Sequence, residues 1–239
     1  MSTVLITGCS SGFGLETAQL FLARGWHVVA TMRTPQADGL PASDRLRVLA
    51  LDITDPASIA RAADEVRQRH GRLDILVNNA GTIRRADAVD FTEQDWDEVM
   101  DLNLKSAFFL AQAAGRHFIA QGRGKIINVA SMLSFQGGIR VPSYTASKSG
   151  MAGITRLLAN EWAGKGVNVN AIAPGYMATD NTAQLRADAQ RNTAILERIP
   201  AGRWGTPEDL GGTAVFLASR ASDYVNGAVI PVDGGWLAR

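Results

Sequence analysis

A tyrosine and a lysine four residues apart are the side chains in this sequence best suited to acid–base chemistry. Tyr144 and Lys148 begin a segment of helical period, so they should lie on one face of a helix, one turn apart. A phenol with its ordinary pKa of about 10 is a poor base at neutral pH, but a nearby ammonium group stabilises the phenolate and lowers that pKa. We therefore expect Tyr144 and Lys148 to act together as a general acid and base.

Two polar residues that precede this pair could complete a catalytic site. Ser131 follows a predicted strand at residues 125–130, and its hydroxyl could donate a hydrogen bond to a substrate carbonyl oxygen. Asn103 falls inside a predicted helix at residues 95–121 and could fix a water that passes a proton onward from Lys148. A tyrosine and a lysine at helical spacing are usually a packing coincidence, but the four residues in this order on one fold indicate a catalytic constellation.

A glycine-rich turn follows the first predicted strand. Its spacing is G-x-x-x-G-x-G, and an amphipathic segment follows it. Glycine lets a backbone turn tightly and approach a pyrophosphate, whose charge is favoured by free N–H groups at a helix N-terminus. The turn therefore predicts a dinucleotide site, although an ordinary glycine-rich turn between a strand and a helix has the same pattern. The residues expected at this site are Gly8, Ser10, Ser11, Gly12, Phe13 and Gly14.

The end of the second predicted strand indicates which nicotinamide cofactor binds. An acidic residue there would hydrogen-bond the adenosine ribose of NAD, whereas a basic residue suits the 2′-phosphate of NADP. The sequence has Arg33 at this place and no carboxylate until Asp38, and the hydroxyl of Ser11 could assist. This favours NADP(H) over NAD(H), although Arg33 could also be a solvated surface residue.

Two more strand ends carry residues suited to the cofactor. Asp52, with Ile53 beside it, could accept a hydrogen bond from the adenine amino group, or it could instead cap a helix. The segment Asn79, Ala80 and Gly81 follows the fourth predicted strand and suits close packing of backbone against the cofactor. Both places are expected at the same edge of a sheet as the glycine turn.

Short β-branched runs alternate with longer segments of helical period along the whole chain. Strands with little apolar–polar alternation are buried on both faces, so this pattern predicts a doubly wound α/β fold of about seven parallel strands with helices on both faces. Asp55 before Pro56, and Thr206 before Pro207, indicate helix starts. The strands are predicted at residues 4–7, 27–31, 47–51, 75–78, 125–130, 168–173 and 229–232.

Composition limits the possible partners. The 239 residues, 46% of them apolar, predict one domain, and a net charge of +1 gives no reason to expect nucleic acid or a membrane surface. A small-molecule substrate is therefore expected. A single cysteine and the lack of a signal-peptide pattern predict a cytoplasmic protein. The cysteine, Cys9, is expected to be a small buried side chain. The three histidines lack the spacing of metal ligands, so no metal site is expected.

Taken together, these motifs resemble the short-chain dehydrogenase/reductase family over essentially the whole chain. The resemblance rests on the glycine turn, on residues 78–81, on Asn103, Ser131, Tyr144 and Lys148, and on Pro174 and Gly175 followed by Thr179. It implies that Asn103, Ser131, Tyr144 and Lys148 form a catalytic tetrad. It also implies that Lys148 holds the nicotinamide ribose. It further implies that residues 173–179, with Pro174, Gly175, Met177 and Thr179, cover the nicotinamide. Helices near residues 95–121 and 144–164 would pair between the subunits of a homotetramer.

After about residue 74 the chain is similar to members of this family that act on sugar acids such as 2-dehydro-3-deoxy-D-gluconate. The first 74 residues resemble another, NADP-preferring branch, which suggests a mosaic joined near Asp74. A flap over the substrate is expected at residues 177–199, and Arg85 and Arg203 are further candidates to bind a carboxylate. Alternatives are a 3-oxoacyl thioester or simple ketone reductase, or a non-catalytic dinucleotide-binding sensor. The expected substrate-binding residues are Ser131, Gln136, Arg140, Tyr144 and Arg84.

Overall fold

Seven parallel strands form one sheet within residues 2–239, which the structure, a computed structural model, describes apart from the side chains of His70 and Asn181. The strand order is β3-β2-β1-β4-β5-β6-β7, and every predicted strand is confirmed to within one residue at each end. The bounds are β1 Thr3–Thr7, β2 His27–Met32, β3 Leu46–Ala50, β4 Ile75–Asn78, β5 Gly124–Val129, β6 Val167–Pro174 and β7 Val229–Val232.

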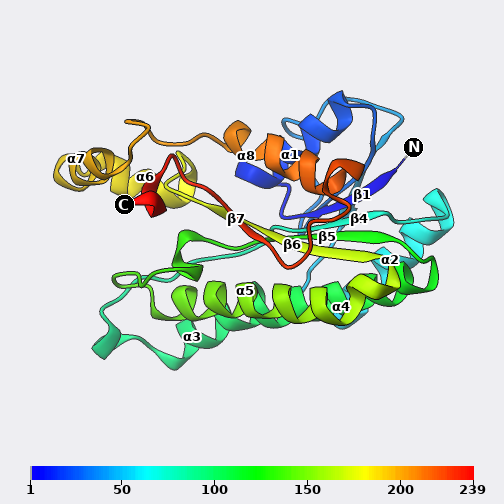
Figure 1. Cartoon of the computed structure of the whole chain (residues 1–239), viewed down its shortest axis with the longest axis horizontal. Coiled ribbons are helices and arrows are strands. Elements are labelled where there is room, and N and C mark those ends of the chain that lie inside the picture. Colours follow the sequence, from blue (N-terminus) through cyan, green and yellow to red (C-terminus); the bar gives the residue numbers. More distant parts are fainter. Residues whose placement is uncertain (1) are drawn as a thin grey trace.

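Helices cover both faces of this sheet, as the strand composition predicts (Figure 1). Helices α1 (Gly12–Ala23) and α8 (Pro207–Ala218) pack on one face, where Phe21 and Leu210 are fully buried. Helices α2 (Pro56–His70), α4 (Ser106–Ala120) and α5 (Pro142–Trp162) pack on the other, around Phe118 and Leu158. Burial of the central strands on both faces explains why they carry almost no polar alternation.

The order of the strands reverses direction at β1 and β4, because β2 and β3 follow β1 on one side and β4 to β7 extend on the other. In a doubly wound sheet the crevice beyond the carboxyl ends of the strands at such a point is the usual place for a ligand. The glycine turn after β1 and the segment after β4 therefore meet there.

The single long helix predicted at residues 95–121 is wrong in detail. Helix α3 (Glu93–Met100) begins two residues earlier because Thr92 caps it, accepting a hydrogen bond from the Asp95 amide at 3.1 Å. A π-helical turn, Asp101–Lys105, then separates α3 from α4. The turn contains no proline or glycine from which the sequence could have predicted it. Asn103 lies at its centre.

The other predicted helix starts are confirmed. Asp55 accepts a hydrogen bond from the Ala57 amide at the start of α2, and Thr206 and Asp209 form a capping box at the start of α8. Between β6 and α8 the chain forms α6 (Ala183–Ala187) and α7 (Ala189–Arg198). Single 3-10 turns lie at Ala88–Asp90, Met132–Ser134, Ala163–Lys165, Asp180–Thr182, Arg220–Ser222 and Trp236–Ala238.

The chain is tightly packed around residue 74, where a mosaic join is suggested by the sequence. Strands β1 and β4 pair in parallel, with Val4 opposite Ile75. The Asp74 carboxylate accepts a hydrogen bond from the Thr3 amide at 2.8 Å and also binds Arg72. The segments before and after Asp74 thus form one continuous core.

Candidate active site

A cavity of about 580 Å³ lies at the carboxyl ends of β1, β4 and β5. This volume is within the range of roughly 300–1,000 Å³ that is usual for small-molecule sites. Most of the residues that the sequence assigns to the cofactor line it: Gly8, Ser10, Ser11, Gly12, Phe13, Arg33, Asp52, Ile53, Asn79, Ala80, Gly81, Tyr144, Pro174, Gly175, Met177 and Thr179.

Two predicted cofactor residues, Gly14 and Lys148, are not among the residues that line the cavity. Conversely, several residues that do line it were not predicted as site residues from the sequence. The unpredicted residues come from strand ends and the segments after them, from α3 and α8, and from the π-helical turn, where single side chains give no recognisable pattern. They are Thr7, Met32, Leu51, Thr82, Glu98, Leu102, Val129, Ala130, Asp180, Thr182 and Leu210.

The geometry of the glycine turn fits a dinucleotide phosphate. Gly8 and Gly12 have φ of +71° and +57°, which side chains other than glycine rarely adopt, and a Cβ at Gly14 would collide with the Gly8 carbonyl. Ser11 is the N-cap of α1, but its side chain makes no capping hydrogen bond. The first N–H groups of α1 therefore lack both helical and side-chain partners at the cavity wall, which suits a negatively charged ligand.

Hydrogen bonds join the ends of β1 and β4 beside this turn. The Thr7 hydroxyl accepts from the amides of Asn79 and Ala80, both at 2.9 Å. The Asn79 side-chain amide donates to the Thr7 carbonyl at 2.8 Å and to the Gly8 carbonyl at 3.2 Å. Asn79 thus holds the glycine turn in place, and Thr7, which no motif predicts, holds residues 79–80.

Asp52 does not cap α2, because Asp55 does so. The Asp52 carboxylate accepts from the Thr54 amide and hydroxyl, at 2.9 and 2.6 Å. These bonds, with a smaller contribution from the positive charge of Arg33, lower the pKa of Asp52. The helix-cap alternative for Asp52 is therefore wrong, and an ionised carboxylate lies on the cavity wall near the Arg33 guanidinium.

The structure brings Ser131 and Tyr144 together. Both line the cavity, and the Ser131 hydroxyl is near enough to act on the pKa of the Tyr144 phenol. Burial nevertheless raises the pKa of Tyr144, against the opposing effects of the Ser131 hydroxyl and the positive charge of Arg85. The lowering of the Tyr144 pKa that the sequence predicts from Lys148 is therefore not found.

Lys148 explains that difference. Its ammonium donates to the Val129 carbonyl at 2.6 Å and lies 5.5 Å from the centre of the Tyr144 ring. Burial lowers the pKa of Lys148 from 10.5 to about 8. Desolvation thus weakens the charge that was expected to stabilise the phenolate.

Asn103 is buried behind the cavity. Its side-chain oxygen accepts from the Thr82 amide and its nitrogen donates to the Thr82 carbonyl, both at 2.8 Å. The nitrogen also lies 3.3 Å from the Ser147 hydroxyl on α5. These bonds tie residue 82 to the π-helical turn and to the helix that carries Tyr144 and Lys148.

Of three arginines that the sequence offers as carboxylate partners, Arg84, Arg140 and Arg203, only Arg84 lines the cavity. Arg84 lines the cavity and forms ion pairs with Glu98 and, at 3.6 Å, Asp95. Arg140 does not line it and instead pairs with Asp87 at 3.1 Å; its backbone has a φ of +62°. Arg203 pairs with Asp209 at the start of α8.

Gln136 is also placed away from the cavity, next to the C-terminal segment. Its side-chain oxygen accepts from the Trp236 indole at 3.2 Å, and Trp236 packs against Tyr176 and under the Arg198 guanidinium. Trp204 belongs to the same aromatic cluster, so both tryptophans lie within the chain's own packing.

Cys9 is buried below the glycine turn, as predicted. Its thiol donates to the Ile6 carbonyl, and burial raises its pKa to about 12, so the reactive thiolate is suppressed. Among the described residues no group of three or more histidine, cysteine, aspartate or glutamate side chains is placed to hold a metal ion. The side chain of His70 lies outside the described residues.

A doubly wound sheet with an uncapped glycine turn at its switch point is the architecture of a dinucleotide-dependent oxidoreductase. Residues 8–237 match the family model described as enoyl-(acyl carrier protein) reductase, and the chain belongs to the short-chain dehydrogenase/reductase family. No helix among the described residues is long and apolar enough to cross a membrane.

Among named relatives, the 2-dehydro-3-deoxy-D-gluconate 5-dehydrogenase of Escherichia coli is 59% identical over 98% of this chain and 95% of its own length. The Bacillus subtilis enzyme of the same name is 51% identical over 99% and 95%. An NADP-bound crystal structure from Agrobacterium tumefaciens, provisionally described as a 2-deoxy-D-gluconate 3-dehydrogenase, is 56% identical with a TM-score of 0.91, covering 100% of this chain and 97% of that one. These alignments extend across Asp74, and the mosaic origin stays a hypothesis.

The buried ammonium gives a pH-dependent prediction for Lys148→Met. Between pH 8 and 10.5 the folded protein holds fewer protons on this lysine than the unfolded chain does. Burial of the charged lysine therefore lowers the free energy of unfolding fully below pH 8, and this loss of stability disappears as the pH rises towards 10.5. The unfolding free energy of Lys148→Met minus that of the unsubstituted protein should therefore fall by about 2 kcal/mol from pH 7 to pH 10.

Urea unfolding at each pH measures this difference, and the titrations of Cys9 and Tyr144 cancel in it because both proteins retain these residues. Lys105→Met, at an exposed ion pair with Asp101, is the matched control and should show no comparable trend. A pH-independent difference for Lys148→Met would show that this ammonium is not desolvated.

Proposed function

We propose that this enzyme transfers a hydride between NADP and a sugar acid, 2-dehydro-3-deoxy-D-gluconate or a close relative of it. The observation that carries the proposal is that Ser131 and Tyr144 line the same cavity as the glycine turn. The names of the similar proteins support the substrate class, and the NADP bound to the Agrobacterium tumefaciens protein supports the cofactor.

The residues present fit the cofactor along the whole cavity. The amides of the glycine turn would hold the pyrophosphate, Arg33 and Ser11 the 2′-phosphate, and Asp52 with Ile53 the adenine. Asn79, Ala80 and Gly81 would pack against its middle, and Lys148 would hold the nicotinamide ribose. Pro174, Gly175, Met177 and Thr179 would cover the nicotinamide, which supplies the hydride in reduction or accepts it in oxidation.

In reduction, the Tyr144 hydroxyl gives its proton to the substrate oxygen, and in oxidation the phenolate takes that proton back. Ser131 donates a hydrogen bond to the same oxygen and holds it beside the phenol. Lys148 must be charged to stabilise the phenolate, and its pKa of about 8 places this change close to neutral pH. Asn103 acts as a positioning residue through Thr82 and α5, and passage of a proton through a water beside it stays a prediction.

Arg85 is proposed to bind the substrate carboxylate, although it is not among the residues that line the cavity. Its positive charge reaches the Tyr144 phenol and acts to lower the pKa of that group. Arg84 lines the cavity and forms ion pairs with Glu98 and Asp95. Arg140 and Arg203, which pair elsewhere, and Gln136, which binds Trp236, are not included in the proposed substrate site.

We also propose that residues 177–199 form a flap over the substrate. Met177 pairs with Gly205 at the base of the segment, and Thr182 donates to the Met177 carbonyl at 2.6 Å. Helix α6 buries none of its described residues, whereas α7 buries Ile195 in the cluster that contains Trp236. Movement would therefore be concentrated near α6, with α7 as the anchored end.

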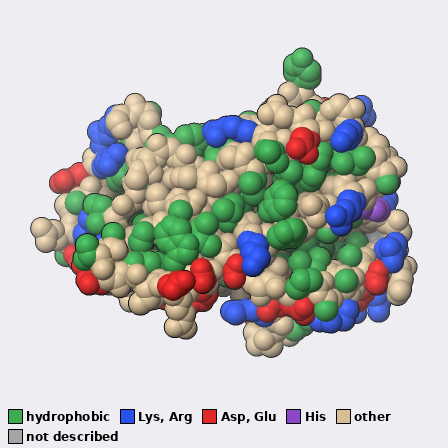
Figure 2. Space-filling view, turned by 90° about the horizontal axis from the view of Figure 1, so that it is seen from below, with side chains coloured by type: hydrophobic (Ala, Val, Ile, Leu, Met, Phe, Trp, Pro, Cys, Tyr) green, Lys and Arg blue, Asp and Glu red, His purple; other side chains and the backbone are tan. Residues whose placement is uncertain are grey.

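A homotetramer, formed in the cytoplasm, is proposed from the surface. Hydrophobic side chains gather over the face that carries α3, α4 and α5 (Figure 2). Phe109 on α4 and Leu157 on α5 are about half exposed there, at 50% and 48%. An apolar face of this kind on paired helices suits association with the same helices of another subunit.

Tyr144→Phe tests the proton transfer. The variant keeps the ring and loses the hydroxyl, so kcat for sugar-acid oxidation should fall by roughly 10²–10⁴-fold, the usual contribution of a positioned acid or base. Tyr224→Phe, at an exposed tyrosine, is the matched control. Full turnover by Tyr144→Phe would reject the mechanism. If the unsubstituted protein bound NADP tightly but turned over no substrate, the alternative of a non-catalytic dinucleotide-binding sensor would be favoured.

Arg33→Ala tests cofactor choice. Loss of a charge-assisted hydrogen bond of roughly 1.5–3 kcal/mol to the 2′-phosphate should lower the ratio of kcat/KM for NADP to that for NAD by about tenfold or more. Steady-state rates with both cofactors give this ratio, and Arg61→Ala on the exposed surface of α2 should leave it unchanged. An unchanged ratio in Arg33→Ala would remove the basis for preferring NADP.

Arg85→Gln tests the carboxylate partner. We expect kcat/KM for 2-dehydro-3-deoxy-D-gluconate to fall by about 10-fold or more, because a charged hydrogen bond to the carboxylate is lost. A neutral analogue with a hydroxymethyl group in place of the carboxylate should be affected little. Arg203→Gln is the control, and equal losses on the acid and the neutral analogue would assign Arg85 a structural role. A 3-oxoacyl thioester tested alongside should be the poorer substrate.

A further inference from the structure

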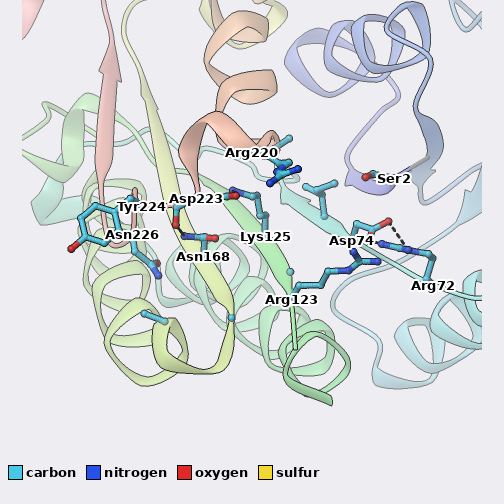
Figure 3. Close-up of a pocket in the computed structure, with 15 residues that line it drawn as sticks. Ser2, Arg72, Asp74, Arg123, Lys125, Asn168, Arg220, Asp223, Tyr224 and Asn226 are labelled. Carbon is cyan, nitrogen blue, oxygen red and sulfur yellow. Dashed lines mark hydrogen bonds and ion pairs between the residues drawn. The ribbon is translucent and has the colours of Figure 1, made fainter. Parts of the chain in front are cut away.

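A second cleft, of about 680 Å³, lies at the opposite edge of the sheet from the cofactor cavity. It is lined by residues at the amino ends of β4, β5 and β6 and by the ends of α5 and α8 (Figure 3). It shares no lining residue with the cofactor cavity. We propose that this cleft binds a phosphorylated small molecule, separately from the nicotinamide cofactor.

The cleft has more positive than negative side chains. Its charged lining residues are four basic ones, Arg72, Arg123, Lys125 and Arg220, and two acidic ones, Asp74 and Asp223. Figure 3 shows Arg72, Asp74 and Arg123 close to one another, with Lys125 and Asp223 together further along the cleft.

Both acidic groups are already engaged by the protein. Asp74 binds Arg72 and accepts from the Thr3 amide, and its side chain is only 10% exposed. Asp223 pairs with Lys125 at 2.8 Å, and the same ammonium donates to the Ser222 hydroxyl at 3.0 Å. The acidic side chains therefore neutralise Arg72 and Lys125 and are not available to the two remaining arginines.

Arg123 and Arg220 have no hydrogen-bond or ion-pair partner for their guanidinium groups among the residues that the structure describes. The nearby amide side chains are also committed, since Asn168 donates to the carbonyls of Asp223 and Val225, and Asn226 binds the backbone of β6. Two unneutralised cations in one cleft favour an anionic ligand.

A phosphate group is the anion that fits best. The planar guanidinium donates parallel hydrogen bonds that match phosphate oxygens, and a phosphate can carry the two negative charges that Arg123 and Arg220 would balance. The volume of the cleft exceeds what a single inorganic ion needs and is within the range for a metabolite. The exposed side chain of Ala163 offers apolar surface to the organic part.

A purely structural explanation also exists for these arginines. Arg123 follows the C-terminal end of α4, and Arg220 follows that of α8. A cation at the end of a helix is stabilised by the helix dipole without any ligand, typically by about 0.3–1 kcal/mol. The experiment must therefore distinguish a binding site from charge compensation, and Arg24, the exposed C-cap of α1 outside the cleft, provides the comparison.

Isothermal titration calorimetry with inorganic pyrophosphate provides the test, on enzyme saturated with NADP so that the cofactor cavity is filled, and at constant ionic strength. We expect saturable binding at one site per chain. Arg123→Gln and Arg220→Gln should each weaken it by about tenfold or more, and Arg24→Gln should leave it unchanged. Arg123→Lys and Arg220→Lys, which keep the charge, should weaken it less than the glutamine variants.

Adenosine diphosphate in place of pyrophosphate tests whether an organic part adds affinity, and tighter binding is expected. Absence of saturable binding, equal binding by the glutamine variants and the unsubstituted enzyme, or equal weakening by Arg24→Gln would overturn the site. Equal binding of citrate would overturn the assignment to phosphate. Circular dichroism of each variant confirms that lost binding is not lost folding.

Discussion

The parallel sheet, buried on both faces, is the constraint on which the rest of this structure depends. Because every strand runs the same way, the carboxyl ends of β1, β4 and β5 meet at one edge, and the loops that follow them must share that space. Hydrogen bonds from Asn79 and Ala80 to Thr7 then fix two of these loops to each other. Residues far apart in the sequence thereby line one cavity.

Burial has opposite consequences at the two titratable groups behind this cavity. It raises the pKa of Tyr144 and lowers that of Lys148 to about 8, because at both groups it disfavours the charged form. Negative charge brought close by a ligand would stabilise the ammonium, and a charged ammonium would in turn stabilise the phenolate. The reactivity of this site therefore depends on the charges close to both groups and not on their ordinary pKa values alone.

Much of this arrangement could be predicted from the sequence, because strands buried on both faces, glycines at a tight turn and a tyrosine–lysine pair at helical spacing leave local patterns. Other features depend on tertiary contacts that have no local pattern. The π-helical turn around Asn103 follows no proline or glycine, and Thr7 looks like any strand residue. Arg140 and Gln136 lie near the catalytic residues in sequence, yet their partners, Asp87 and Trp236, come from distant segments and hold them away from the cavity.

The π-helical turn also limits how the chain can change in length. Such a turn contains one residue more than regular α-helical geometry would need, and each residue of an α-helix advances the direction of its side chain by about 100°. Removing a single residue between Asp101 and Lys105 would make the helix regular and close the widened turn, so that the side chains inside it, Asn103 among them, would change direction. Asn103 would then lose Thr82, so this stretch of helix tolerates a one-residue deletion less well than a surface loop would.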